Sequence, residues 1–249
     1  MDPYQIVILV SIGLCAGVIN TLAGGGSNLS LPALMMFGLP ADIANATNRV
    51  SVLLQSLTAS RGFYKHNKIS SVAVKDTFLP LFLGGLFGAI IASYMSIELL
   101  KPLLLGTMIC LSLWVVMRSD SVPNNEIEPI SCSQSTTGFI TTFLAGFYGG
   151  FVQAGVGFVL IATFVGVLKY DLLRANALKV VAAVIFTSIA LVVFIIRDQV
   201  AWVPGLTLAI GSIVGAQIAV KFAISIKAKT LKWLVFLMTL VASIAALII

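Results

Sequence analysis

The chain has 249 residues, of which 59% are hydrophobic and 10% are charged. Soluble domains contain about 45–50% apolar and about 25% charged residues, so this composition excludes a soluble globular protein and indicates an integral membrane protein. The net charge is +6, but the basic residues lie in short stretches between apolar segments. That pattern is typical of loops on the cytoplasmic side of a membrane, and it excludes nucleic acid as a partner.

Apolar segments of helical length follow one another along the chain. The first, Tyr4–Leu22, is long enough to span a bilayer at about 20 residues per crossing. It ends at a glycine-rich break, Gly24–Asn28, and the short apolar run Leu29–Leu39 follows. A polar connector, Arg118–Ser135, separates this half from a second one with a break around Gln153–Gly157. The other expected segments are Ile43–Phe63, Val72–Met95, Leu99–Met117, Thr136–Val152, Phe158–Leu168, Leu172–Ile196, Val200–Phe222 and Thr230–Ile249.

The order of segments recurs in the second half, and so do individual residues. The matches are Ala16-Gly17 with Ala145-Gly146, Gly26 with Gly155, Ala44-Asn45-Ala46 with Ala175-Asn176-Ala177, and Gly84 and Gly88-Ala89 with Gly211 and Gly215-Ala216. Chance similarity between apolar helices is the alternative, but shared glycines in the same order favour duplication. We therefore expect a single membrane domain over 1–249, with repeat one at 4–117, a linker at 118–135 and repeat two at 136–249.

The distribution of basic residues predicts the topology. With the N-terminus outside and each broken hairpin returning to its starting side, eleven of the fifteen bases fall in inside loops and two fall outside. Both termini are then outside, and the second half is inverted relative to the first. The predicted fold class is an all-α integral membrane protein with two inverted-topology repeats, each a broken-helix hairpin plus three transmembrane helices. Inverted repeats around broken helices are the architecture of secondary transporters.

The two breaks are the predicted substrate site. A glycine break leaves backbone groups without helical partners, which at membrane depth is tolerated where they are buried in protein or line a wet cavity. Half-helix N-termini at such breaks present positive dipole ends to anions. We expect the two tips to meet near the midplane of the membrane. A tight turn in an interfacial loop is the alternative interpretation.

Two basic residues lie within apolar helices. Arg49 and Lys179 are each about two turns into a long segment, at about 5.4 Å per turn, and they occupy nearly equivalent places in the two repeats. Intramembrane bases cost about 2.5–3.5 kcal/mol each on insertion scales, so a function in anion binding is the default interpretation. The alternative is that the long side chains extend to the nearer interface.

The candidate substrate-binding residues combine these bases with neighbouring polar and glycine positions. They are Asn20, Gly24, Gly25, Gly26, Ser27, Asn28, Asn45, Asn48, Arg49, Gln153, Gly155, Asn176 and Lys179. Asn and Ser also bridge helices in membranes, which is the alternative for each of them. All nine carboxylates fall at helix ends or in loops, so a cation site built on buried acids is not predicted. No catalytic set, metal-ligand cluster or cofactor motif is present, so we expect no enzyme activity, no metal and no cofactor.

The residues around the first break carry a resemblance to a known family. Ala16-Gly17, Gly24-Gly25-Gly26-Ser27, Leu31-Pro32-Ala33-Leu34 and Thr47-Asn48, with a weaker repeat from Ala145 onward, resemble the TauE/SafE sulfite exporter family, also called the 4-toluene sulfonate uptake permease family. The resemblance covers nearly the whole chain and implies a permease of a bacterial cell (inner) membrane for sulfite, sulfonates or other small organic anions. Gln153 and Ala154 replace the first two glycines in the second repeat, so the halves need not bind alike.

The sequence thus predicts a secondary transporter of a small anion, working by alternating access in the lipid bilayer. The absence of buried carboxylates favours uniport or proton coupling over sodium coupling. An anion-selective channel and a non-transporting subunit of a membrane complex are the alternative functions. The transported anion, the direction of transport and the oligomeric state are not encoded in any motif we identify.

Overall fold

The structure is a computed structural model that describes residues 1–117 and 128–225. Within these ranges the chain forms helices and no strands. The elements are α1 (Pro3–Leu22), α2 (Ser27–Met36), α3 (Ala41–Lys65), α4 (Ser71–Tyr94), α5 (Ile97–Met117), α6 (Thr136–Phe151), α7 (Val156–Ile161), the π-helical turn η1 (Ala162–Val167), α8 (Leu172–Ile196) and α9 (Trp202–Ser225). The expected helix Thr230–Ile249 and the first part of the connector lie outside the described residues.

Both predicted helix breaks are confirmed. The first helix stops at Leu22, and α2 begins at Ser27. In the second half α6 stops at Phe151, and α7 begins at Val156. The backbone turns into the left-handed region within each break, with φ of +96° at Gly24 and +65° at Gln153. Left-handed residues terminate a helix because they direct the next peptide units away from its axis.

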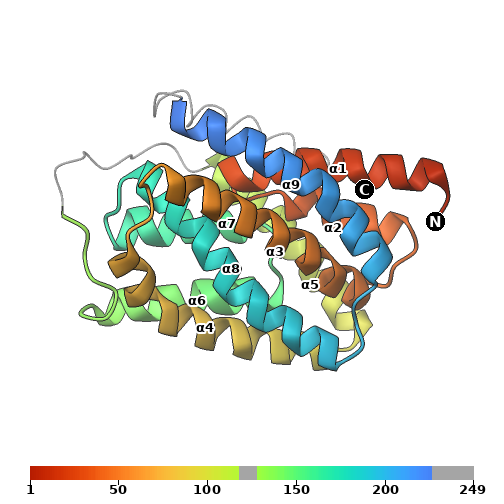
Figure 1. Cartoon of the computed structure of the whole chain (residues 1–249). Coiled ribbons are helices and arrows are strands. Elements are labelled where there is room, and N and C mark those ends of the chain that lie inside the picture. Colours follow the sequence, from red (N-terminus) through yellow and green to blue (C-terminus); the bar gives the residue numbers. More distant parts are fainter. Residues whose placement is uncertain (118–127, 226–249) are drawn as a thin grey trace.

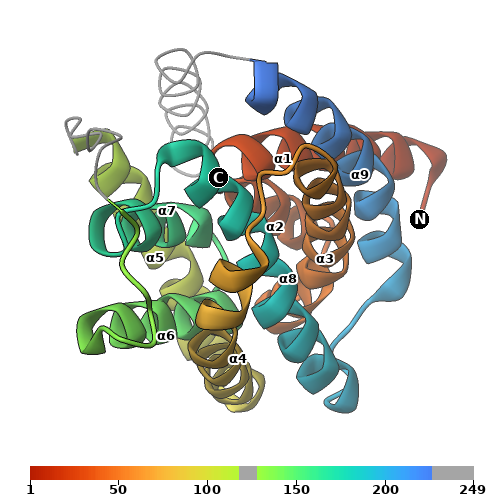
Figure 2. The same ribbon diagram turned by 60° about the vertical axis from the view of Figure 1, so that its left-hand side comes forward.

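The two longest helices, α3 and α8, run through the middle of the molecule. Figures 1 and 2 show them between the pair α1–α9 on one side and the pair α4–α6 on the other, and α3 packs on α9 as α8 packs on α4. The central helices are antiparallel, since the Arg49 guanidinium lies over the ring of Phe194 while Val52 and Gln55 share a cavity wall with Lys179. Each half of the chain therefore contributes one central helix.

Glycines allow the outer pairs to pack closely. A β-carbon at Gly84 of α4 would overlap the carbonyl oxygen of Phe143 in α6, and one at Gly211 of α9 would overlap that of Val10 in α1. Small residues at such contacts bring membrane helices within van der Waals distance. These glycines are therefore packing positions. Each pair joins a helix of the first half to one of the second.

Four helices in the described ranges are long and apolar enough to cross a membrane, namely α1, α4, α8 and α9. Large apolar side chains such as Phe87, Ile196 and Ile210 are exposed on them, which suits a surface covered by lipid. The central helix α3 is long enough but more polar, because it carries Asn45, Asn48 and other buried polar residues. A helix enclosed by its neighbours does not need an apolar surface of its own.

Candidate functional site

The two helix breaks touch each other in the core of the molecule. The backbone N–H of Gly157 donates a hydrogen bond to the carbonyl oxygen of Gly24 at 3.2 Å. A β-carbon on either residue would overlap the α-carbon of the other. The break of one half therefore lies directly on the break of the other, at a contact that only glycine permits on both sides.

Beside this contact lies a small buried cavity. Its volume is about 10 Å³, close to the space that a single water molecule needs. The breaks and the central helices supply its polar wall, and aliphatic residues complete it. The wall consists of Asn20, Thr21, Ser27, Gln55, Ser56, Gln153 and Lys179, with Val52, Val156, Gly157, Leu160, Val180 and Ala183. The cavity thus lies between the two halves of the chain, which both contribute polar groups to a partly aliphatic wall.

Lys179 is the charged residue of this wall. Its side chain is 2% exposed, and its ammonium donates to the carbonyl oxygens of Asn20 at 3.0 Å and Thr21 at 3.1 Å. These carbonyls belong to the last turn of α1, where helical partners end and the helix dipole is negative. The ammonium of α8 therefore stabilises the broken end of a helix from the other half.

Arg49 makes the reciprocal contact from α3. Its guanidinium, which has no exposed surface, donates to the carbonyl oxygens of Gly149 at 2.8 Å and Gly150 at 2.7 Å, at the end of α6. One of its nitrogens also lies 3.3 Å from the oxygen of Phe151, and its charge lies 4.8 Å from the ring centre of Phe194. Both intramembrane bases are therefore buried in protein, and neither extends to solvent as the alternative interpretation required.

Asn48 connects the two breaks from behind the cavity. Its amide nitrogen lies 3.0 Å from the hydroxyl of Ser27 and 3.4 Å from the side-chain oxygen of Gln153, and its oxygen accepts from Ser30 at 2.6 Å. Gln153 in turn donates to the hydroxyl of Thr187 at 2.9 Å. This chain of hydrogen bonds fixes wall residues from both halves in one orientation.

The other candidate residues lie around the same place. Gly25 and Gly26 complete the first break, and Asn28 lies next to Gly155 across the contact. The amide nitrogen of Asn45 donates to the carbonyl oxygen of Phe151 at 3.0 Å. Its sequence counterpart Asn176 is 1% exposed, and neither of its amide atoms has a hydrogen-bond partner in the described structure. The structure therefore gathers the candidates around the breaks except Asn176, for which it shows only a buried place on α8 one turn before Lys179.

Sequence reasoning missed several wall residues. Thr21, Gln55 and Ser56 line the cavity but were not among the candidates. A signal for the last two was present, because polar residues of α3 recur at helical spacing at 45, 48, 49, 55 and 56 and so share one face. Thr187, which accepts the bond from Gln153, has only Ser188 as a polar neighbour in an apolar segment and carried no such signal.

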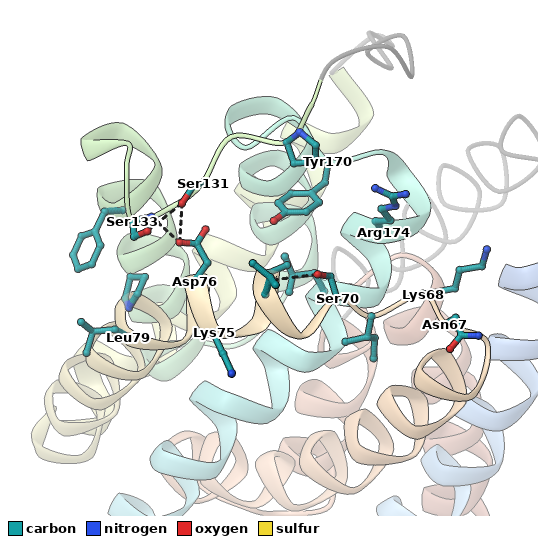
Figure 3. Close-up of a pocket in the computed structure, with 17 residues that line it drawn as sticks. Asn67, Lys68, Ser70, Lys75, Asp76, Leu79, Ser131, Ser133, Tyr170 and Arg174 are labelled. Atoms are coloured by element: carbon teal, nitrogen blue, oxygen red, sulfur yellow. Dashed lines mark hydrogen bonds between the residues drawn. The ribbon is translucent and has the colours of Figure 1, made fainter.

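A larger cavity lies elsewhere, at the end of the bundle where α4, α6 and α8 begin. It measures about 960 Å³ and shares no residue with the cavity at the breaks. Figure 3 shows Asp76 pointing at the connector, where its carboxylate accepts from Ser131 at 3.0 Å and from the backbone N–H of Ser133 at 2.9 Å. Tyr170 also lines this cavity, and burial raises the pKa of its hydroxyl. The Asp76 carboxylate is occupied by its hydrogen bonds to the connector. This cavity is therefore separate from the site that the breaks define.

Broken apolar helices that enclose a buried polar cavity define a class of protein, the polytopic membrane transport proteins. Among the described residues, no three His, Cys, Asp or Glu side chains come together as a metal site would require. The model of one protein family, described as Sulfite exporter TauE/SafE, matches residues 9–246. The chain therefore belongs to the TauE/SafE family, as the resemblance predicted.

Similar proteins from three bacteria have related descriptions. The chain is 26% identical over 226 residues to a "Probable membrane transporter protein" of Haemophilus influenzae, a match covering 91% of this chain and 88% of that protein. It is 25% identical over 243 residues to the "Probable membrane transporter protein YfcA" of Escherichia coli K12, covering 98% and 90%. It is 23% identical over 248 residues to YunE of Bacillus subtilis, described in the same words, covering 90% and 91%. The chain is a membrane transporter and not an enzyme.

Proposed function

We propose that the protein is a secondary transporter of small sulfur-containing or organic anions, such as sulfite or sulfonates, which works by alternating access. The observation that carries this proposal is the polar cavity at the contact of the two breaks, with the ammonium of Lys179 in its wall. An anion there would meet a positive charge and the neutral hydrogen-bonding groups of Ser27 and Gln153. The family description, sulfite exporter, points to the same class of substrate.

The packing of the helices supports inverted repeats as the basis of the mechanism. Equivalent central helices, α3 and α8, run antiparallel, and each half holds the broken helix of the other through a buried base. The cavity is nearly closed, which fits an occluded state between two open ones. Rocking of one repeat against the other would open it to either side. We place the protein in a bacterial inner membrane with both termini outside, and protons remain the coupling ion we favour.

The test is exchange of labelled anion in proteoliposomes. Vesicles loaded with unlabelled anion should take up labelled sulfite, or a labelled two-carbon sulfonate, above its equilibrium level, while acetate and phosphate serve as comparison anions. Such counterflow requires a carrier, because a channel cannot accumulate label by exchange. Flux without counterflow would favour the anion channel, and no flux of any anion would favour the non-transporting subunit.

A further inference from the structure

The two buried bases stand at equivalent ends of broken helices but differ in how their hydrogen-bond donors are used. The Arg49 guanidinium donates to three carbonyl oxygens of α6, approaches the side-chain oxygen of Asn45 at 3.5 Å, and lies over the ring of Phe194. It is absent from the cavity wall. Its Nε is buried without a hydrogen-bond partner in the described structure, but since the guanidinium does not line the cavity, this donor does not face an anion there.

Lys179, in contrast, lines the cavity. An ammonium has three N–H donors, and in the described structure two carbonyl oxygens of α1 accept from it. It forms part of the cavity wall, and no other residue of that wall is ionisable. The ion pair found among the described residues joins Arg174 and Asp171 at the start of α8. Lys179 has no carboxylate partner among these residues. A buried charge without a counter-charge is costly, and an anion in the cavity would supply one.

We infer that Lys179, and not Arg49, is the cation that contacts the transported anion, and that its single charge selects a monovalent anion. This inference rests on the proposed function and assigns the two bases separate roles. Arg49 holds the end of α6 and does not touch the substrate. The difference agrees with the residue types, because a planar guanidinium can donate to several carbonyl oxygens at once whereas a lysine ammonium is a compact charge.

The test compares variants in counterflow with labelled methanesulfonate, a fully ionised monovalent anion. Lys179→Gln should raise the KM about tenfold or more, the scale of one lost charge-assisted hydrogen bond, and Lys179→Arg should recover much of the loss. Arg49→Lys keeps the positive charge but loses the planar guanidinium with its several N–H donors. It should lower the temperature of thermal unfolding and leave the KM of the folded protein within about twofold of wild type.

The charge of the substrate is tested on the wild type, so this arm does not depend on a variant that folds. Methanesulfonate and sulfate are both tetrahedral sulfur oxyanions of similar size, but sulfate is divalent. Unlabelled methanesulfonate should compete at a concentration at least about tenfold lower than sulfate. Equal competition, or an unchanged KM in Lys179→Gln, would overturn this inference while the transport function stands. A wild type that moves no anion would overturn both.

Discussion

The ammonium of Lys179 in α8 lies 3.0 Å from the carbonyl oxygen of Asn20 at the end of α1, so a base of the second half holds the broken helix of the first. Arg49 does the same in the opposite direction, with Gly149 as the equivalent acceptor at 2.8 Å. The two halves are therefore joined at their breaks by charge, at the place where each helix has lost its own hydrogen bonds.

The contact of the breaks requires glycine at Gly157. We expect Gly157→Ala to lower the free energy of unfolding by about 1–3 kcal/mol, as overpacking in a tight core does, because the new β-carbon would overlap Gly24. Transport should fall with it, since the cavity lies beside this contact. Thermal unfolding of the purified protein and counterflow measure the two effects.

Gly106→Ala is the matched control for that substitution. Outside its own helix, no atom of the described residues lies within 4 Å of the β-carbon that it would add, so the change should be neutral or slightly stabilising. A Gly157→Ala protein as stable and active as Gly106→Ala would show that the two breaks do not lie as close together as the structure places them.

The counterparts Asn45 and Asn176 should respond differently to the same change. Asn45→Leu removes the hydrogen bond to the carbonyl oxygen of Phe151 and should cost about 1 kcal/mol or more in stability. Asn176→Leu removes a buried amide without a partner in the described structure, so stability should be unchanged or higher. Thermal unfolding of both variants provides the measurement.

A transport assay distinguishes a binding role of the unpaired Asn176 amide from a structural role. Asn176 does not line the small cavity, so as a candidate binding residue it would contact the anion in a more open state, and it should be needed for transport even though it is not needed for stability. Asn176→Leu should then be well folded but have a higher KM for the anion. An equal loss of stability in both variants would mean that Asn176 is a structural residue like Asn45.

Asp76 should control the reactivity of the buried thiol of Cys132. Its carboxylate accepts hydrogen bonds from the backbone N–H groups of Cys132 and Ser133, and it holds this loop on α4. Burial raises the pKa of the Cys132 thiol, and the charge of Asp76 raises it further. Because the thiolate is the reactive form, Cys132 should be alkylated slowly at pH 8, at a rate that climbs about tenfold per pH unit below the pKa.

Asp76→Asn should accelerate that alkylation at pH 8, since it loosens the loop and lowers the pKa of the thiol. The measurement uses a background in which the two exposed cysteines, Cys15 and Cys110, are replaced by serine. Thr142→Val tests the neighbouring contact of the same thiol and leaves the loop bonds intact. A rate unaffected by Asp76→Asn would contradict the role assigned to this carboxylate.

The helices and both breaks could be predicted from the sequence because local signals define them. Apolar runs of membrane-spanning length and the glycines near Gly24 and Gly155 placed every described helix to within a few residues. The partners of Arg49 and Lys179 could not be predicted, because they are backbone carbonyls a hundred or more residues away, and any amino acid supplies a carbonyl. The separate roles of the two bases depend on those partners and emerge only from the structure.

The connector shows the same limit. The sequence places Asp76 near a helix end, and nothing there indicates that it binds the loop at Ser131–Ser133, because the acceptor of a loop's N–H groups has no sequence signature. The polar stripe on α3 is the opposite case. The helical spacing of these polar residues is visible in the sequence, and extending the same spacing beyond Arg49 predicts Gln55 and Ser56 on the same face.

The most direct test of the central claim is to locate the anion. A crystal structure with selenite, a heavier analogue of sulfite whose anomalous scattering marks its position, should show a peak within about 3.5 Å of the Lys179 ammonium, at hydrogen-bonding distance. The peak should lie between Ser27 and Gln153, in a cavity wider than the one described here. A peak only in the large cavity beside Asp76, from a protein that transports selenite, would contradict the placement of the site at the breaks.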